Sequence, residues 1–473
     1  MQRLAVDICV IGAGSGGLSV ASASSQMGAS TVLIEKSKMG GDCLNYGCVP
    51  SKSLLAAAHA AENARKASRF GVDCTPPKVD DARVYGHVRS VIAAIAPNDS
   101  TERFEALGVK VIHAAAKFVG PREVEAGDYR ITARRFVIAT GSGPAIPPIP
   151  GLDTVPFDTN ETMFDRSALP RRLIVIGGGP IGMEMAQAHR GLGAEVTVLE
   201  RFNILPKDDP ELTAILRDLL VRDGIRIVEQ AEIAKLEKTG SGVAATVRMN
   251  GKEERIEATD ILVAAGRKPV LDGLGLEAAG IACTPKGVTV DARLRTTNKR
   301  VYAIGDAAGP YQFTHMAGYH AGIVIRNALL RLPAKVDHRA VPWVTYTDPE
   351  LAQVGMSEQD ARGRNLPFRV LRWSFHENDR AQAERVTDGL VKVVATPRGR
   401  VLGASILGAH AGDLIQIWAL AITQGLKVSA LAGMIAPYPT LGEVNKRAAG
   451  SFYTAALFGP KLRRLVRFLA LFG

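Results

Sequence analysis

The 473-residue sequence is poor in the features of secreted, membrane-spanning and nucleic-acid-binding proteins. Its five cysteines are too few and too scattered for the disulfide framework of a small secreted domain. No stretch approaches about 18 uninterrupted apolar residues, so we expect no membrane-spanning helix. No basic segment with a cleavage site precedes the first apolar run, which Asp7 interrupts. We therefore expect a cytoplasmic protein.

Aromatic residues are also scarce, at 5%, which bears on how the net charge of +11 is interpreted. The basic residues are scattered along the chain and no stacking aromatic motif accompanies them, so we expect no nucleic-acid partner. The 22% of charged and 47% of hydrophobic residues are typical of a globular chain, and the length predicts two or three domains.

Two cysteines five positions apart are the strongest chemical signal present. Cys43 and Cys48 lie in the run 40–52, GGDCLNYGCVPSK. A helix rises about 7.5 Å over five residues, whereas disulfides rarely tolerate Cα separations above about 6.8 Å. A bridge therefore needs an irregular turn, for which Gly47 and Pro50 are suited. Because a strained bridge is easily reduced, we expect a redox-active dithiol; the alternative is two unrelated core cysteines.

A dinucleotide-binding pattern precedes this pair. The expected buried strand 6–11 leads into GAGSGG at 12–17, and a small-residue helix and a strand over 31–34 follow, ending at Glu35. Strand, glycine loop, helix, strand and acid in this order form the Rossmann unit. In such a unit Gly12 makes the turn, Gly14 lets the backbone approach a pyrophosphate at the helix N-terminus, Gly17 lets helix and strand pack, and Glu35 is placed to bind a ribose.

The same pattern occurs a second time. A strand over 172–176 leads into GGGPIG at 177–182, and a strand over 196–199 ends at Glu200. The equivalent cofactor-binding positions are Gly177, Gly179, Gly182 and Glu200. Two dinucleotides are therefore expected. Gly182 and Glu200 suit a free 2′-hydroxyl, which favours NADH, and Arg201 beside the acid leaves NADPH open.

The chain resembles the class I pyridine nucleotide-disulfide oxidoreductases, a family that includes dihydrolipoamide dehydrogenase, glutathione reductase and mercuric reductase. Besides the two loops and the cysteine pair, the resemblance rests on four further segments, 139–141 (ATG), 265–269 (AGRKP), 303–306 (AIGD) and 344–350 (VTYTDPE). Val270 stands where asparagine is usual. The resemblance implies an α/β fold with two Rossmann-like domains, for FAD and NAD(P), and a C-terminal α+β dimerisation domain that makes a homodimer.

The resemblance also assigns roles to residues. Cys48 is implied to be the thiol beside the flavin, Cys43 the thiol that attacks the acceptor, and Lys52 and Glu184 an ion pair near the flavin. Both thiols need thiolate character, which helix N-termini and nearby cations favour. The further cofactor-binding positions implied are Ala116, Thr140, Gly141, Gly266, Asp306 and Thr314. The histidines show no spacing typical of a metal site, and we expect none.

The sequence departs from the disulfide reductases near its C-terminus. The run 436–443, APYPTLGE, matches their His-Pro-Thr and later Glu, but Tyr438 replaces the histidine while Glu443 remains. Tyrosine, with a pKa of about 10, is a poor general base at neutral pH. Tyr438 resembles instead the mercuric reductases, although no cysteine follows Cys283 and no GMTCxxC module is present, so we expect weak mercury detoxification at most.

The function implied is an NAD(P)H oxidoreductase with FAD that passes electrons through Cys43 and Cys48 to a small acceptor, a metal ion, a quinone or a disulfide. One alternative is a dihydrolipoyl dehydrogenase using NAD, which Glu200 supports and Tyr438 opposes. Another is a membrane-docked redox sensor without turnover. His376 or His410 could substitute for the missing histidine, but we expect both to be bystanders.

The motifs divide the chain into four segments. Residues 1–148 and 270–336 would bind FAD, 149–269 NAD(P), and 337–473 would form the dimerisation domain, with paired strands at 389–394 and 401–406 and a helix over 413–425. The tail 460–473 predicts an amphipathic helix with an apolar face and a basic face. The apolar face holds Leu462, Leu465, Val466 and Leu469, and the basic face Arg463, Arg464 and Arg467. This helix could lie on an anionic membrane or dock on its own domain.

Overall fold

The chain forms two compact units in the computed structural model, which describes residues 1–249 and 251–472. The first unit contains Met1–Gly177, Met185–Leu199 and Ala231–Val336. The second contains Gly178–Glu184, Glu200–Gln230 and the chain from Asp337 onward.

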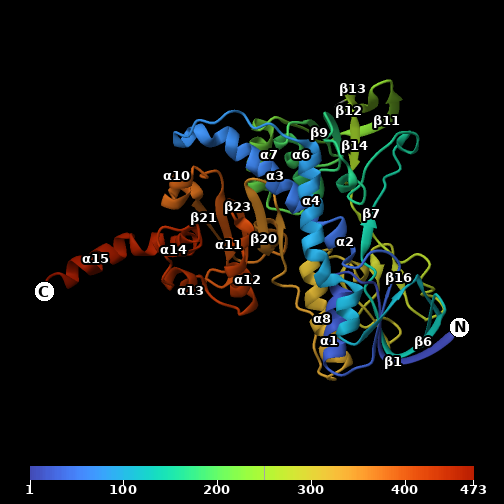
Figure 1. Cartoon of the computed structure of the whole chain (residues 1–473). Helices are drawn as coiled ribbons and strands as arrows, with labels where there is room; N and C mark the ends of the chain where they lie inside the picture. Colours follow the sequence, from blue (N-terminus) through green and yellow to red (C-terminus); the bar gives the residue numbers. More distant parts are fainter. Residues whose placement is uncertain (250, 473) are drawn as a thin grey trace. The chain divides into compact units, whose positions relative to one another are not determined.

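The first unit contains a mixed sheet in the order β3-β2-β1-β6-β5-β4, with β18 also paired to β6. Figure 1 labels its strands β1 and β6. The first four strands of this order, and β18, pair in parallel, whereas β4, β5 and β6 pair antiparallel. The strands are β1 (Gln2–Ile11), β2 (Thr31–Glu35), β3 (Val109–His113), β4 (Ala116–Gly120), β5 (Glu123–Ala126), β6 (Tyr129–Ile138) and β18 (Val301–Ala303). The helices are α1 (Ser15–Gln26), α2 (Gly41–Asn45), α3 (Cys48–Lys66), α4 (Asp81–Ile95), α5 (Thr101–Ala106) and α8 (Thr314–Ala328).

The second half of the central strand, residues 8–11, is buried on both faces of the sheet, which explains the apolar run that follows Asp7. Successive side chains of a strand point to opposite faces. Accordingly, Val10 packs in a cluster with Leu18 of α1 and Val324 of α8, while Ile11 packs in a second cluster with Phe136. Figure 1 shows α1 and α8 side by side. The strand expected over 6–11 is confirmed and begins earlier, at Gln2.

The second glycine-rich segment has the same local order. Strand β8 (Arg172–Ile176) pairs in parallel with β9 (Glu195–Leu199) and β14 (Asp260–Val263), and α6 (Pro180–Gly191) follows β8. The short strands β7 (Ser142–Pro144) and β15 (Arg267–Pro269) pair with each other, as do β16 (Cys283–Thr284) and β17 (Gly287–Val288). An antiparallel sheet joins β11 (Glu232–Thr239), β12 (Gly242–Met249) and β13 (Lys252–Ala258).

The second unit is built on an antiparallel sheet in the order β19-β20-β23-β22-β21. Its strands are β19 (Pro342–Thr345), β20 (Glu350–Gly355), β21 (Arg369–Ser374), β22 (Leu390–Ala395) and β23 (Val401–Gly408), and β10 (Ile225–Val228) lies in an earlier segment. Its helices are α7 (Pro210–Arg222), α9 (Glu358–Gly363), α10 (Asp379–Glu384), α11 (Ala411–Leu414), α12 (Gln416–Thr423), α13 (Val428–Gly433), α14 (Glu443–Leu457) and α15 (Pro460–Leu469). The predicted pairing of 389–394 with 401–406 is confirmed by β22 and β23.

The single helix expected over 413–425 is wrong, because the chain forms α11 and α12 with a break at Ile415. At the break Trp418 N–H donates to the Ile415 carbonyl, a tighter turn than an α-helix makes. This turn lets both side chains enter the core, where the Trp418 indole donates to Asn445 of α14 at 2.7 Å. The predicted helix end is confirmed at Gly425, which has φ +65.

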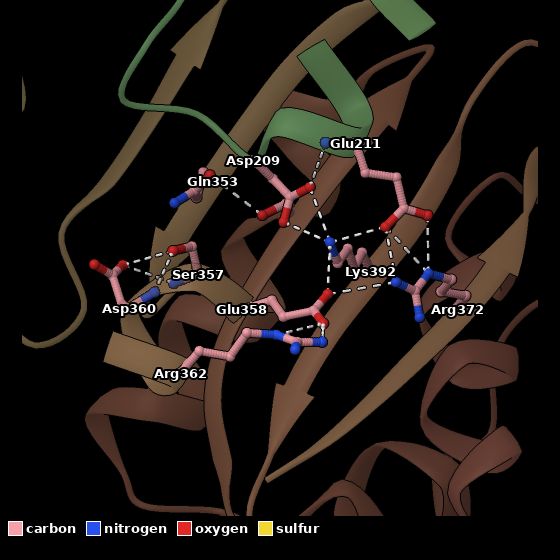
Figure 2. A network of polar contacts seen from close by, with 10 residues as sticks. Asp209, Glu211, Gln353, Ser357, Glu358, Asp360, Arg362, Arg372 and Lys392 are labelled. Atoms are coloured by element: carbon pink, nitrogen blue, oxygen red, sulfur yellow. Dashed lines mark hydrogen bonds and ion pairs between the residues drawn. The ribbon is translucent and has the colours of Figure 1, made fainter. Parts of the chain in front are cut away.

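A buried lysine on β22 ties several elements of the second unit together (Figure 2). The Lys392 side chain is 4% exposed, and its Nζ lies 2.8 Å from Asp209 and Glu211 and 2.9 Å from Glu358. Arg372 on β21 binds Glu211 as well. Because every carboxylate has a cationic partner, this cluster joins the start of α7 to the sheet without leaving a buried charge unpaired.

Candidate functional site

The cysteine pair lies where one helix ends and another begins. Cys43 lies in the short helix α2, and Cys48 is the first residue of α3. Between them Gly47 has φ −122 and ψ −113, outside the helical region. The expected irregular turn is therefore confirmed, and Gly47 belongs to it. Pro50 does not, because it lies in the first turn of α3, where a missing N–H costs nothing.

Close backbone packing holds this segment against the first glycine loop. Gly40 N–H donates to the Ala13 carbonyl at 3.0 Å. Gly41 has φ +60, and a Cβ there would lie 2.7 Å from the Cα of Gly14. A Cβ on Gly47 would lie 2.8 Å from a carboxylate oxygen of Asp42. Glycine is therefore required at position 41, whereas a side chain at position 47 would displace the Asp42 carboxylate.

The two sulfurs lie together as free thiols at the N-terminus of α8. Cys43 and Cys48 form a side-chain hydrogen bond, and Cys48 Sγ lies 3.5 Å from Thr314 Oγ1. Thr314 is the first residue of α8, so the positive end of that helix faces the pair. The family resemblance had implied that Cys48 lies beside the flavin and that Thr314 binds a cofactor. The structure places these two residues together although they are 266 positions apart in the sequence.

The expectation of thiolate character needs a correction for one of the thiols. The hydrogen bond with Cys48, together with burial, raises the pKa of the Cys43 thiol. Cys43 lies inside α2, whereas Cys48 occupies a helix start, where a thiolate is favoured. Two adjacent sulfurs share one negative charge when the pair is reduced, and the raised pKa of Cys43 disfavours a thiolate on that sulfur.

A polar chain that sequence reasoning missed links this segment to Asp306. Arg267 Nη2 lies 3.1 Å from Asp42 Oδ1, and Arg267 Nε donates to Ser142 Oγ at 2.8 Å. Ser142 Oγ in turn donates to Asp306 Oδ2 at 2.5 Å, and burial raises the pKa of this carboxyl. Asn160 also donates to Asp42, at 3.0 Å. Arg267 lies in the 265–269 motif and Asp42 beside Cys43, but only the fold brings them together.

The acid of the first loop closes that loop upon itself. Glu35 Oε2 accepts from Ala13 N–H at 2.6 Å, and Oε1 accepts from Ser37 N–H at 2.7 Å. Gly12, with φ +103, has no room for a side chain, because a Cβ would lie 2.4 Å from the Ala139 carbonyl oxygen. A carboxylate oxygen has two lone pairs, so Glu35 can bind a ribose and hold the loop at once.

The second loop repeats these contacts. Glu200 Oε2 accepts from Gly178 N–H at 2.6 Å, and Oε1 accepts from Phe202 N–H at 2.8 Å. Gly177 has φ +113, and a Cβ there would lie 2.4 Å from the Ala264 carbonyl oxygen. Gly179, like Gly14, has open space where a Cβ would stand, while Gly182 lies within α6. Both loops can therefore receive a pyrophosphate.

Several features of the first unit fit FAD. The hydroxyl oxygen of Thr140 is buried and has no hydrogen-bond partner in the part of the chain that the structure describes. Gly141 beside it has φ +68. Ala116 begins β4 with its side chain buried, so its backbone is the part left for a ligand. A Cβ on Gly17 would lie 1.8 Å from the Gly12 carbonyl oxygen, so the loop needs glycine to close. Gly266 lies instead in the segment expected to bind NAD(P), has φ +124 and has no atom within 4 Å of where a Cβ would stand.

The remaining predicted residues are distributed over both units. Lys52 lies in the second turn of α3. Glu184 is buried and accepts from Tyr346 N–H at 3.0 Å. The pairing of Lys52 with Glu184 stays a prediction.

Tyr438 is 69% exposed in the single chain, and its hydroxyl donates to Asp379 at 2.8 Å. This hydrogen bond raises the pKa of the phenol. Glu443, the first residue of α14, accepts from Arg447 Nε at 3.0 Å. Asp379 was missed, because nothing in the sequence joins positions 59 residues apart. His410 precedes α11, with its Nδ1 3.9 Å from Asp413, and His376 lies in a 3₁₀ turn, so both remain expected bystanders.

The family models agree with this arrangement. The model described as pyridine nucleotide-disulphide oxidoreductase matches residues 6–321, and the dimerisation domain of the same family matches residues 341–449. The chain belongs to the pyridine nucleotide-disulphide oxidoreductases. The resemblance inferred from the motifs is thus confirmed, as is the α/β fold with nucleotide-binding domains and a C-terminal dimerisation domain.

Known relatives align with nearly the whole of this chain. Mercuric reductase from Streptomyces lividans is 36% identical over 454 residues, 94% of this chain and 96% of the relative. Dihydrolipoyl dehydrogenase from Thermus scotoductus is 35% identical over 461 residues, covering 95% and 98%. Among solved structures, a Cu(II) complex of the HOCl-induced flavoprotein disulfide reductase RclA from Escherichia coli is 27% identical with a TM-score of 0.84, covering 93% of this chain and 99% of that chain.

These findings establish the class of chemistry. The protein is an NAD(P)H-dependent flavoprotein oxidoreductase with FAD and a redox-active disulfide, and it forms a homodimer. Within the described residues, no group of three or more His, Cys, Asp or Glu side chains could hold a metal ion. Nor does any helix in 1–249 or 251–472 have the length and apolarity to cross a bilayer.

Proposed function

We propose that this oxidoreductase uses NADH to reduce a thiophilic metal cation, such as mercuric or cupric ion, held by Cys43 and Cys48. The observation that carries the proposal is Tyr438, which stands where disulfide-exchanging members of the family have histidine. Its raised pKa keeps the phenol protonated at neutral pH, so it cannot accept a thiol proton. A cation that binds thiolates directly needs no such base. The similarity to mercuric reductase and to a protein that forms a Cu(II) complex also supports this acceptor class.

The chemistry balances without a further reactant. NADH supplies two electrons, and a divalent ion that takes both gives NADH + M²⁺ → NAD⁺ + H⁺ + M⁰; two cupric ions would each take one. FAD, when bound, carries electrons between the nicotinamide and the sulfur pair. By the family resemblance Cys48 lies beside the flavin and Cys43 receives the acceptor first. The hydrogen bond between the two sulfurs raises the pKa of Cys43, which supports that order because it disfavours a thiolate on Cys43 before an acceptor binds.

The other site residues have supporting roles in this proposal. The family resemblance places Lys52 and Glu184 as an ion pair beside the flavin, and Glu443 beside the acceptor with Tyr438. The glycine loop held by Glu35 binds FAD, and the glycine loop held by Glu200 binds the nicotinamide cofactor. Glu200 favours NADH, because a 2′-phosphate would meet its carboxylate. The division into segments 1–148, 149–269, 270–336 and 337–473 belongs to the same proposal.

The test is steady-state oxidation of NADH and NADPH with mercuric ion, cupric ion, lipoamide, glutathione disulfide and quinones. We expect metal ions to be the preferred acceptors and Cys43→Ala with Cys48→Ala to abolish their reduction. Tyr438→His should raise lipoamide turnover by about a hundredfold, the lower end of what general acid–base catalysis contributes. Faster turnover with lipoamide than with any metal in the unmodified enzyme would favour the dihydrolipoyl dehydrogenase alternative, which 35% identity to that enzyme supports. Stoichiometric reduction without turnover would favour the redox sensor.

We further propose that the enzyme is cytoplasmic and lies against the inner membrane face through its C-terminal helix. α15 has no buried residue, and its exposed apolar side chains include Leu465, Phe468 and Leu469. Three arginines and Lys461 accompany them, with no acidic residue after Glu443. A basic amphipathic helix of this kind binds anionic lipid. The competing possibility is that the helix docks on the dimerisation domain of its own dimer.

Vesicles of anionic and of neutral lipid distinguish these possibilities. Co-sedimentation of the full chain, but not of a chain ending at residue 459, with anionic vesicles alone supports membrane contact. Equal pelleting of both chains would contradict it, and a weaker dimer after truncation would indicate docking on the partner.

A further inference from the structure

The loop that carries Tyr438 is held against the start of α10. The Tyr438 hydroxyl donates to Asp379 Oδ2 at 2.8 Å, and Asp379 is the first residue of α10. Asn378, which precedes it, is buried and donates through Nδ2 to the Thr440 carbonyl at 3.1 Å. Asn378 also caps α10 by accepting from Ala381 N–H at 2.9 Å. The two neighbours of Pro439 are thus both attached to one helix start.

Glu443, the carboxylate of the family motif, is committed elsewhere. Its Oε1 accepts from Arg447 one helical turn along α14. Among the groups that act on the phenol, Asp379 comes first and Glu443 contributes only through its charge. The carboxylate that orients Tyr438 therefore comes from a different element than the motif indicates.

This geometry fixes what the tyrosine oxygen can do. A phenol has one hydrogen and two lone pairs. Because the hydrogen is given to Asp379, the lone pairs remain for another group, and the carboxylate places a negative charge beside the tyrosine oxygen. Such an oxygen attracts a cation and offers no hydrogen bond to an anion or a carbonyl.

We propose that Asp379 is the positioning residue for Tyr438, replacing the histidine–glutamate pair of disulfide-exchanging relatives with a tyrosine–aspartate pair that accepts cationic substrates. The proposal rests on the proposed function, since it names the charge of the acceptor that the site selects. Asp379 acts through Tyr438 and is not itself a catalytic residue.

The first readout needs no acceptor. The titration of Tyr438 is measured as the phenolate absorbance lost on Tyr438→Phe, in the parent holoenzyme and in variants of Asp379. Asp379→Asn keeps the shape of the helix start and removes the charge, so the pKa of Tyr438 should fall toward that of free tyrosine. Glu384→Gln is the matched control, because Glu384 is on the same helix and binds Arg380. It should leave the pKa unchanged. Glu443→Gln should have a smaller effect than Asp379→Asn.

The second readout separates positioning from folding. Asp379→Asn should raise KM for the metal ion by about tenfold, as the loss of a charge-assisted hydrogen bond predicts, with a smaller change in kcat. In the Tyr438→Phe background the same substitution should have no further effect, because its target is gone. Asp379→Glu should recover part of the loss.

The outcomes are distinguishable from those that test the acceptor. An unchanged phenol pKa in Asp379→Asn, or additive effects of the two substitutions, would overturn the pairing even in an enzyme that reduces metals well. A lowered phenol pKa in a protein that reduces no metal ion would uphold the pairing and refute the proposed function.

Discussion

The two glycine-rich loops use the same contacts but lead to different structures. In both, an acid at the end of the second strand accepts from the second residue of the loop, Ala13 or Gly178. In both, the chain returns to that residue, through Gly40 N–H in the first loop and Leu205 N–H in the second. After the first contact the chain continues into α2 and α3, which carry Cys43 and Cys48. After the second contact it continues through Asp208 and Asp209 into α7. The two loops therefore share one backbone arrangement, but only the first of them leads to the redox-active cysteines.

The largest expected effect is at the first return. Gly41→Ala would put a side chain at φ +60, at a cost of about 1–2 kcal/mol, and 2.7 Å from the Gly14 backbone. The added side chain must push α2 away from the first glycine loop, which is the loop expected to bind FAD. We therefore expect at least about tenfold less bound FAD, measured as flavin absorbance per chain. Gly28→Ala has a similar φ of +85 and nothing within 4 Å. It should keep its flavin, and equal losses in the two variants would contradict the importance of the contact.

The second return should affect stability instead. Lys392→Met leaves Asp209, Glu211 and Glu358 without their shared cation, which costs about 3 kcal/mol for a buried pair. All three tryptophans of the chain, Trp343, Trp373 and Trp418, lie in the second unit, so urea unfolding followed by fluorescence reports on it. Arg222→Met removes an exposed partner of Asp388 in the same unit and is the control. A loss no larger than that of the control would show that the buried cluster does not hold α7.

Asp208, also at the second return, gives a pH-dependent effect. Burial raises its pKa to about 6, although Trp343 donates to it at 2.8 Å. A carboxyl whose pKa is higher in the folded state stabilises the fold below about pH 4 and loses that contribution as the pH rises through 6. Asp208→Asn should therefore raise the free energy of unfolding at pH 7 by about 2 kcal/mol, with little change at pH 4. A gain that is the same at both pH values would contradict the raised pKa.

The smallest expected effects come from substituting Glu35 and Glu200, and they should differ in which cofactor is lost. Glu35→Gln replaces one of two backbone-binding oxygens with an NH₂ group, and should weaken FAD binding by about tenfold. Glu200→Gln makes the same change in the second loop, and should raise KM for NADH to a similar extent while FAD content is retained. Equal loss of FAD in both variants would show that the loops do not serve separate cofactors.

The loops and the turn between the cysteines could be predicted from sequence because their contacts are local. Glycines at 12 and 177, and an acid 23 positions after each, define both units, and Gly47 sets the turn at Cys48. The break at Ile415 could not be predicted, because it depends on Trp418 reaching Asn445 on a later helix. The ties from Asp42 to Arg267 and from Tyr438 to Asp379 join positions far apart, so composition and spacing carry no signal for them.

The most direct measurement is the number of electrons that the oxidised enzyme takes from NADH under anaerobic titration. If Cys43 and Cys48 form the relay, the parent enzyme should take up about two more electrons per chain than the variant with serine at both positions, because a disulfide is a two-electron couple. Equal uptake by the two proteins would contradict the relay.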